Sequence, residues 1–132
     1  MTNDSGIITQ YRRAMLCKIT SGAIPAIVPI THIAFGDGGV DINGEPIPPN
    51  ADATALNNEI ARYPIDAPPT YPINSKTTAR YVCTIPAADL PGAFISEVGF
   101  VDGDGNFCAI NTFYVKRKEE GEEFTFTLDD KF

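Results

Sequence analysis

The acidic turn Asp102-Gly-Asp-Gly-Asn106 comes closest in this chain to a metal-binding pattern. Its carboxylate and amide side chains occupy the first, third and fifth positions, as in an EF-hand calcium loop. That loop also requires glycine at its sixth position and glutamate at its twelfth, where this chain has Phe107 and Phe113. We therefore interpret the turn as the reversal of a β-hairpin, for which Asp-Gly is typical. We expect no metal and no other cofactor.

The other residues that could do chemistry are isolated from one another. Gly36-Asp-Gly-Gly39 lacks the lysine and the serine or threonine of a phosphate-binding loop, and no helical pattern follows it. His32 is the only histidine and has no companion at metal-ligand spacing, so a structural role is expected. Motifs of serine hydrolases and zinc proteases are absent from the sequence. We expect no enzyme, although a small hydrolase built from distant carboxylates stays open as an alternative.

The three cysteines, Cys17, Cys83 and Cys108, are far apart and odd in number. They form neither a CxxC motif nor a cluster with histidine, so the pattern indicates free thiols in a protein made in a reducing cytoplasm. Cys83 and Cys108 fall in predicted strands, where the expected role is that of a small buried apolar group.

Composition favours one mainly β domain covering residues 1–132. The chain has 11 glycines and 11 prolines and is rich in β-branched and aromatic residues, which is typical of a turn-rich β protein. Seventeen acidic against ten basic residues give a net charge of -7, which disfavours binding to nucleic acid. No apolar run approaches the roughly 20 residues of a membrane span, and we expect neither a membrane association nor a standard export signal.

The stretch 85–113 is predicted to be the centre of the fold. Its two arms, on either side of the acidic turn, carry apolar residues at both odd and even positions, so neither face of this hairpin is expected to be fully solvated. The residues concerned are Phe94, Val98, Phe100 and Val101 on the first arm and Phe107, Ala109, Ile110 and Phe113 on the second. The hairpin is therefore placed in the middle of an antiparallel β-sandwich-like domain, at about residues 27–128.

An α-helix over residues 6–19 is predicted to precede this domain. Apolar residues recur there at helical spacing, and Asn3, Asp4 and Ser5 are candidate N-caps. Gly22 suits a left-handed C-cap. The basic residues Arg12, Arg13 and Lys18 lie on the opposite side of this helix. We expect them to contact a partner or an acidic neighbour, or to form a solvated face.

The remaining chain is predicted to alternate between strands and irregular connections. Strands are expected at 27–35, 78–85 and 124–128, and connections at 36–54, 66–76 and 86–92. The connection 36–54 is polar, rich in proline and longer than is usual within a compact domain. It is expected to be either a contact surface or a flexible insertion. The segment 56–65 stays ambiguous by periodicity, because its apolar spacing is helical but Pro64 excludes a long helix.

Three ordered blocks of this sequence resemble the phage tail-collar fibre proteins. They are ITHIAFGDGG at residues 30–39, ALNNEIARYPI at 55–65 and FISEVGFVDGDGNFCAI at 94–110. The resemblance implies an extended conformation for 56–65, in which Glu59 and Arg62 are expected to form ion pairs with Arg80 or Glu97. It also implies an amino-terminal module that joins a tail fibre to the baseplate.

The resemblance further implies a homotrimer that is made in the host cytoplasm and resides in the virion tail. Fibres of that family continue much further than Phe132, so this chain is expected to be either a fragment or a short member. Its expected role is that of a structural tail component, which either joins a fibre to the baseplate and other tail proteins or forms a short fibre or collar element itself. The candidate assembly contacts are Tyr11, Arg12, Arg13, Asp37, Val40, Ile42 and Ile47. The alternative is a host-receptor or glycan-binding module, for which the candidate aromatics are Tyr63, Tyr71 and Phe132.

Overall fold

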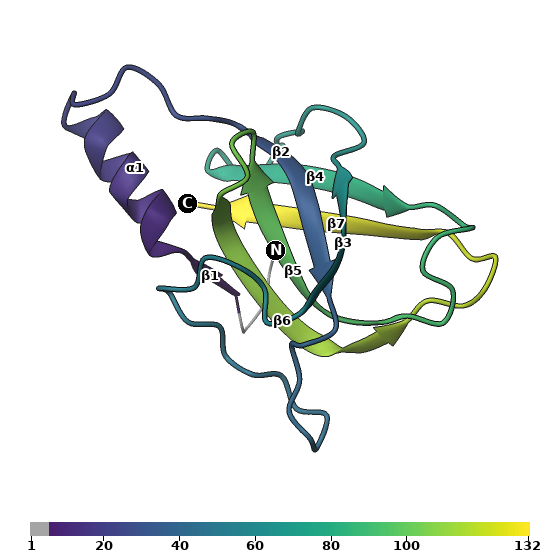
Figure 1. Ribbon diagram of the computed structural model, residues 1–132. Helices are drawn as coiled ribbons and strands as arrows, with labels where there is room; N and C mark the ends of the chain where they lie inside the picture. The colour runs from purple at the N-terminus through teal and green to yellow at the C-terminus, as the bar shows by residue number, and fades with distance from the viewer. Residues whose placement is uncertain (1–5) are drawn as a thin grey trace.

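The structure, a computed structural model that describes residues 6–132, contains two antiparallel β-sheets and one helix near the N-terminus (Figure 1). The elements are β1 (Gly6–Ile8), α1 (Gln10–Thr20), β2 (Ile30–Gly36), β3 (Glu59–Pro64), β4 (Thr78–Ile85), β5 (Phe94–Asp102), β6 (Phe107–Arg117) and β7 (Phe124–Lys131). The predicted class, a mainly β, sandwich-like domain preceded by a helix, is confirmed. Within residues 6–132, no helix is long and apolar enough to cross a membrane.

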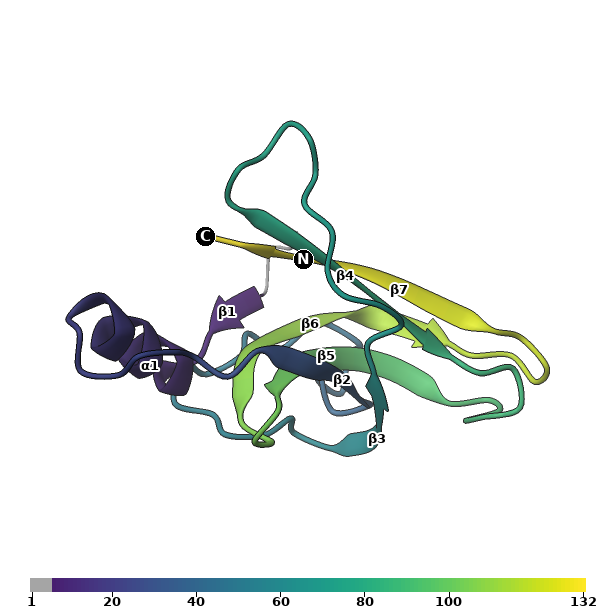
Figure 2. The same ribbon diagram turned by 90° about the horizontal axis from the view of Figure 1, so that it is seen from above.

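The larger sheet has five strands in the order β1-β6-β5-β2-β3, and the smaller sheet consists of β4 and β7. Figure 2 shows β4 and β7 as a separate layer running beside the larger sheet. The predicted hairpin is formed by β5 and β6, and it lies in the middle of the five-stranded sheet. The Asp-Gly-rich turn reverses the chain between them, with Gly105 at φ 87°.

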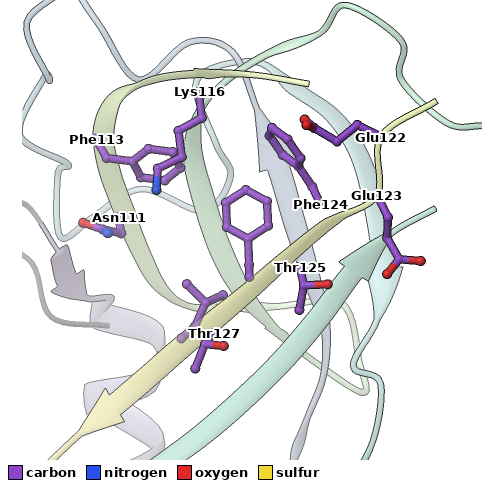
Figure 3. A pocket seen from close by; sticks show the side chains of 10 residues that line it. Asn111, Phe113, Lys116, Glu122, Glu123, Phe124, Thr125 and Thr127 are labelled. Carbon is purple, nitrogen blue, oxygen red and sulfur yellow. The ribbon is translucent and has the colours of Figure 1, made fainter. Parts of the chain in front are cut away.

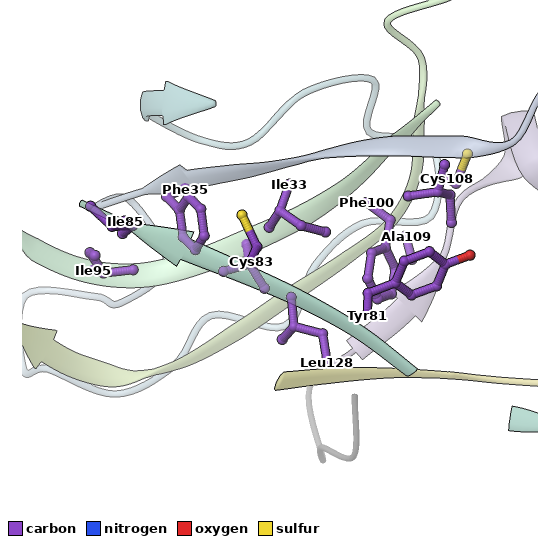
Figure 4. Packing of buried hydrophobic residues seen from close by; sticks show 12 residues of the cluster. Ile33, Phe35, Tyr81, Cys83, Ile85, Ile95, Phe100, Cys108, Ala109 and Leu128 are labelled. Carbon is purple, nitrogen blue, oxygen red and sulfur yellow. The ribbon is translucent and has the colours of Figure 1, made fainter. Parts of the chain in front are cut away.

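Both faces of the central hairpin are buried over residues 95–102 and 107–112, so the prediction that neither face is fully solvated is confirmed. On one face, Phe100 of β5 and Phe35 of the neighbouring β2 pack with the inner side chains of the β4–β7 layer, including Tyr81 and Cys83 (Figure 4). On the other face, Val101 and Phe107 belong to a second cluster that is closed by Leu56, from the segment before β3. The long connection before β3 therefore contributes to the core as well as to the surface.

The predicted start of the helix was wrong. The helix begins at Gln10, with Thr9 as the N-cap whose Oγ1 accepts a hydrogen bond from the Arg12 N–H at 3.3 Å. Residues 6–8 instead form β1, which pairs with residues 109–111 of β6. An available sheet edge outweighs the weak helical preference of Gly6-Ile7-Ile8. The proposed caps Asn3, Asp4 and Ser5 lie outside the described residues, and the proposed C-terminal Gly22 does adopt a positive φ of 84°.

The strand predictions agree with the structure in position more closely than in length. The predicted strand 78–85 matches β4, whereas β2 begins only after Pro29, whose lack of an N–H delays pairing. The last strand continues to Lys131, three residues past the predicted end at 128. Within residues 36–54, pairing is limited to the end of β2 and an isolated bridge between Val40 and Pro46, so the prediction of an irregular connection is confirmed.

The segment 56–65 is extended and contains β3, as the resemblance implies. The predicted ion pairs of this strand were wrong. Glu59 and Arg62 pair with each other at 2.8 Å. The β-bulge at Ile60 interrupts the alternation of side chains along β3, so these two side chains meet although they are three residues apart. Arg80 instead pairs with Asp129 on β7.

Candidate functional site

The three sequence blocks that resemble tail-collar fibre proteins meet at the buried carboxylate of Glu97. Its Oε1 accepts the Asn57 N–H at 2.9 Å. Its Oε2 accepts the Gly38 N–H at 2.9 Å and the Asn58 N–H at 2.8 Å. Glu97 is 1% exposed and lies on β5, and its three donors lie in the segments that follow β2 and precede β3. One side chain therefore fixes two connections that are remote from each other in sequence.

The glycines beside Glu97 are required by the close approach of main chains. A Cβ on Gly39 would lie 2.1 Å from the carbonyl oxygen of Ser96, and one on Gly36 would lie 2.5 Å from that of Asn58. The Gly39 N–H donates to Ser96 Oγ at 2.9 Å. We call the residues Gly36, Gly38, Gly39, Asn57, Asn58, Ser96 and Glu97 the Glu97 junction. Sequence reasoning treated the glycines as a turn and Glu97 as an ion-pair partner in the sheet. The position of Glu97 in the largely apolar segment FISEVGF was a usable sign of its burial.

The Glu97 junction holds the base of a small hairpin formed by residues 40–46. At its tip, Asp41 Oδ1 accepts the N–H groups of Asn43 and Glu45 at 2.8 and 3.0 Å. Tyr114 on β6 donates its hydroxyl to Glu45 Oε2 at 2.8 Å, which anchors the hairpin to the larger sheet. Ile42 is presented at the tip with its side chain 100% exposed. Figure 1 shows this segment, after β2, extending away from the sheets.

The predicted contact residues of the connection divide into exposed and partly covered groups. Ile42 and Ile47 are exposed apolar side chains. Asp37 is exposed and accepts a hydrogen bond from Asn58 Nδ2, whereas Val40 is half-buried beside its bridge to Pro46. Ile42 is therefore the most accessible apolar residue among the predicted contacts.

The predicted contacts on the helix are largely used within the chain. Tyr11 donates its hydroxyl to Asp102 Oδ2 at 2.8 Å. Arg12 forms a buried bidentate pair with Asp130, with distances of 2.7 and 2.6 Å. Arg13 is exposed. The expectation that Arg12 contacts an acidic neighbour is met by a residue of the same chain, so Arg12 is not available as a surface contact.

The residues first considered for metal or acid–base chemistry have structural partners. Asp102 Oδ1 accepts the N–H groups of Asp104 and Asn106 at 2.9 and 3.0 Å, which closes the hairpin turn. His32 Nδ1 lies 2.8 Å from Thr31 Oγ1. Between Gly6 and Phe132, no three His, Cys, Asp or Glu side chains are grouped as a metal ion would require.

The aromatic residues considered for receptor binding differ in accessibility. Tyr71 and Phe132 are exposed. Tyr63 is half-buried and donates its hydroxyl to Asp89 Oδ2 at 2.8 Å. Burial and this hydrogen bond raise the pKa of Tyr63 to about 12, so it stays a neutral donor held within the fold.

The thiols provide a direct test of the core. Burial, with a smaller contribution from the charge of Asp66, raises the pKa of Cys83 to about 12. Burial, with a smaller contribution from the charge of Asp102, raises the pKa of Cys108 to about 11. Cys17 is exposed on α1. Because the thiolate is the reactive form, we expect iodoacetamide at mildly alkaline pH to modify one thiol, Cys17, in the native protein. Intact-mass spectrometry should show one adduct before unfolding and three in denaturant.

A Cys17→Ser variant provides the control for the thiol experiment, and no adduct should form on it in the native state. Modification of native Cys83 at the rate of Cys17 would contradict the packing of β4 against the larger sheet.

A groove that sequence reasoning missed lies between β6 and β7. It has a volume of about 550 Å³ and is lined by Asn111, Phe113, Lys116, Glu122, Glu123, Phe124, Thr125, Phe126, Thr127 and Leu128. Figure 3 shows Phe113 and Lys116 on one side of this groove and Phe124 and Thr127 on the other. We call it the β7 groove. The alternation of phenylalanine and threonine at 124–127 predicted a strand but not which of its edges stays open.

Compared with protein-family models, curated proteins and solved structures, the chain has no significant match. The likeness to tail-collar fibre proteins therefore rests on the three sequence blocks.

Proposed function

We propose that this protein is a structural component of a bacteriophage or phage-like tail. In this role it joins a tail fibre to the baseplate, or itself forms a short fibre or collar element. The observation that carries the proposal is the convergence at Glu97, because all three blocks of the resemblance contribute residues to one junction. Residues that resemble a family at separate places in the sequence are thus parts of a single structural unit.

The surface near the Glu97 junction supports a role in assembly. The hairpin 40–46 presents Ile42 on a turn that is fixed by Asp41 and by the hydrogen bond between Glu45 and Tyr114. An apolar side chain on a rigid support loses little conformational entropy when it enters a pocket on a partner. The connection between β3 and β4 carries two more exposed apolar residues, Tyr71 and Ile73, at 72% and 95% exposure. Figure 2 shows this connection projecting from the β4–β7 layer.

The exposed Tyr71 also supports the alternative of a host-receptor or glycan-binding module, because aromatic rings stack on sugar faces. The two functions differ in where the isolated chain binds. A receptor-binding module would bind cell surfaces by itself, whereas a joint would be retained in assembled tails and would not bind cells in isolation.

Incorporation into tail particles tests the proposal. We expect the chain to co-purify with tails from its native source, and deletion of its gene to give tails that lack fibres or the collar element in negative-stain micrographs. An Ile42→Asp variant should lower incorporation by about tenfold, because a charge replaces an apolar anchor at the contact. Quantitative mass spectrometry of purified particles measures this effect.

An Ala26→Asp variant is the matched control, since it adds the same charge at an exposed position between α1 and β2. Its incorporation should equal that of the wild type. Tails that assemble fully without the chain, or cell binding by the isolated chain, would contradict a role as a joint.

A further inference from the structure

The open edge of β7 can be identified from the hydrogen bonds on the far side of β4. There, the main chain of Arg80 exchanges two hydrogen bonds with Thr70, and the Val82 carbonyl accepts the Asp66 N–H. In an antiparallel strand, the N–H and C=O of one residue point to the same side, and the side alternates along the strand. Arg80 and Val82 therefore direct these groups away from β7.

The pairing register between β4 and β7 shows which residues of β7 direct their main-chain groups away from β4. Arg80 lies opposite Asp129, Val82 opposite Thr127 and Thr84 opposite Thr125. These residues of β7 consequently direct their N–H and C=O groups towards its other edge. No strand among residues 6–132 pairs with that edge, since the smaller sheet consists of β4 and β7. Thr125, Thr127 and Asp129 thus offer a row of donors and acceptors for one further strand.

The side chains beside this edge line the β7 groove, which is partly apolar. In the β7 groove, the Phe126 ring lies 6.0 Å from that of Phe124 and 6.4 Å from that of Phe113, between ring centroids. Asn111 is 5% exposed and also lines the groove, and its Oδ1 has no hydrogen-bond partner among the described residues. A buried acceptor without a partner is costly, and a donor from an occupant of the groove would relieve that cost.

The charges at the groove favour a basic occupant. Glu122 and Glu123 line it together with a single cation, Lys116. Neither glutamate belongs to an ion pair among residues 6–132. The whole chain carries a net charge of -7, so a second copy approaching the groove is repelled at long range. A strand that ends in lysine or arginine would complement the negative charges of Glu122 and Glu123.

We propose that the open edge of β7 binds an extended strand of another polypeptide. The strand adds to the β4–β7 sheet through Thr125, Thr127 and Asp129, directs alternate apolar side chains at Phe113, Phe124 and Phe126, and carries a basic residue beside Glu122 and Glu123. This inference rests on the proposed function only for the source of the strand, which is another protein of the same tail.

Synthetic peptides and the isolated full chain test the inference without any tail particle. The probes are three decapeptides of alternating valine and threonine that end in two lysines, two glutamates or two serines. Each is N-methylated along one edge so that it cannot assemble into extended sheets. In ¹⁵N NMR spectra, the lysine peptide should shift the amides of Thr125, Thr127 and Asp129 and the side-chain amide of Asn111. It should bind about tenfold more tightly than the glutamate peptide.

Two sets of variants test whether peptide binding depends on the open edge of β7 and on the charges of Glu122 and Glu123. Thr127→Pro removes an N–H that faces the groove, and binding should weaken by about five- to tenfold. Thr127→Val keeps that N–H and is the matched control, with wild-type binding expected. Thr125→Pro and Thr125→Val repeat the comparison if Thr127→Pro does not fold. The double variant Glu122→Lys/Glu123→Lys should reverse the preference between the lysine and glutamate peptides.

Three results would overturn the inference. The first is the absence of shifts with every peptide up to about 1 mM, the range of the weakest specific complexes. The second is equal binding of the lysine and glutamate peptides. The third is a shift of the same resonances with protein concentration alone, which would make a second copy of the chain the occupant. Each result concerns the groove alone, so the incorporation experiment can succeed or fail independently of it.

Discussion

Replacing Glu97 with alanine is expected to lower the free energy of unfolding by about 3–5 kcal/mol. The substitution leaves the N–H groups of Gly38, Asn57 and Asn58 without their acceptor and opens a cavity beside β5. Domains of this size are typically stable by only about 5–15 kcal/mol, so the variant should be close to unfolding. Urea denaturation followed by circular dichroism measures the change.

Glu97→Gln separates the hydrogen bonds from the volume of the side chain. The amide keeps the shape of the carboxylate, but its NH₂ group replaces one oxygen and must face a main-chain N–H. We expect a loss of about 2–3 kcal/mol, and hence a melting temperature about 10 °C below that of the wild type. Hydrogen exchange should accelerate at Gly38, Gly39, Asn57 and Asn58 while the β4–β7 ladder stays protected.

Glu120→Gln is the matched control, because it removes the same charge at an exposed position. Its melting temperature should equal that of the wild type. If Glu97→Gln had the same melting temperature as this control, the carboxylate would not be what holds the two connections together. The three sequence blocks would then not form one structural unit through Glu97.

The elements that could be predicted from the sequence are those whose determinants are local. The hairpin of β5 and β6 follows from an Asp-Gly turn between two apolar arms, and β4 follows from alternation within its own eight residues. Burial of both faces of the hairpin was also predictable, since apolar residues occupy both odd and even positions there. In each case the information lies within a few residues of the feature.

The features that could not be predicted depend on residues that are remote in sequence. Glu97 meets Gly38 across 59 positions and Asn58 across 39, and nothing in the irregular connections indicates that register. The helix start was mispredicted for the same reason, because β1 forms only where β6 offers an edge. The open edge of β7 likewise depends on which side of β4 is covered by residues 66–70. Periodicity within one segment carries no information of this kind.

The clearest missed contact is that between Arg12 and Asp130, which are 118 positions apart. Arg12 is 9% exposed and Asp130 is 4% exposed, and the pair connects α1 to β7. Burial opposes the charge on Arg12, but the hydrogen bonds to Asp130 outweigh it and raise the pKa of the guanidinium. Helical periodicity placed Arg12 on the polar side of the helix, and it could not show that β7 would cover that side.

Arg12→Met is expected to destabilise the protein by about 3–5 kcal/mol, because it leaves the carboxylate of Asp130 buried without its partner. The double variant Arg12→Met/Asp130→Leu removes both charges and should recover stability to within about 1 kcal/mol of the wild type. This recovery distinguishes the cost of an unpaired charge from the loss of packing between Arg12 and the Phe132 ring, 4.8 Å away. Denaturant unfolding of the four proteins in this cycle gives the coupling energy directly.

The neighbouring pair of Arg80 and Asp129 provides a control with matched geometry. Its guanidinium also binds the carboxylate through two hydrogen bonds, at 2.7 and 3.0 Å, but the Arg80 side chain is 43% exposed. Arg80→Met should therefore cause a far smaller loss than Arg12→Met, since water can solvate the remaining carboxylate. Equal losses in the two variants, or a double variant as unstable as Arg12→Met alone, would show that burial of the charge is not what makes Arg12 essential. Arg12 would then attach the helix through its hydrocarbon stem and its contact with Phe132.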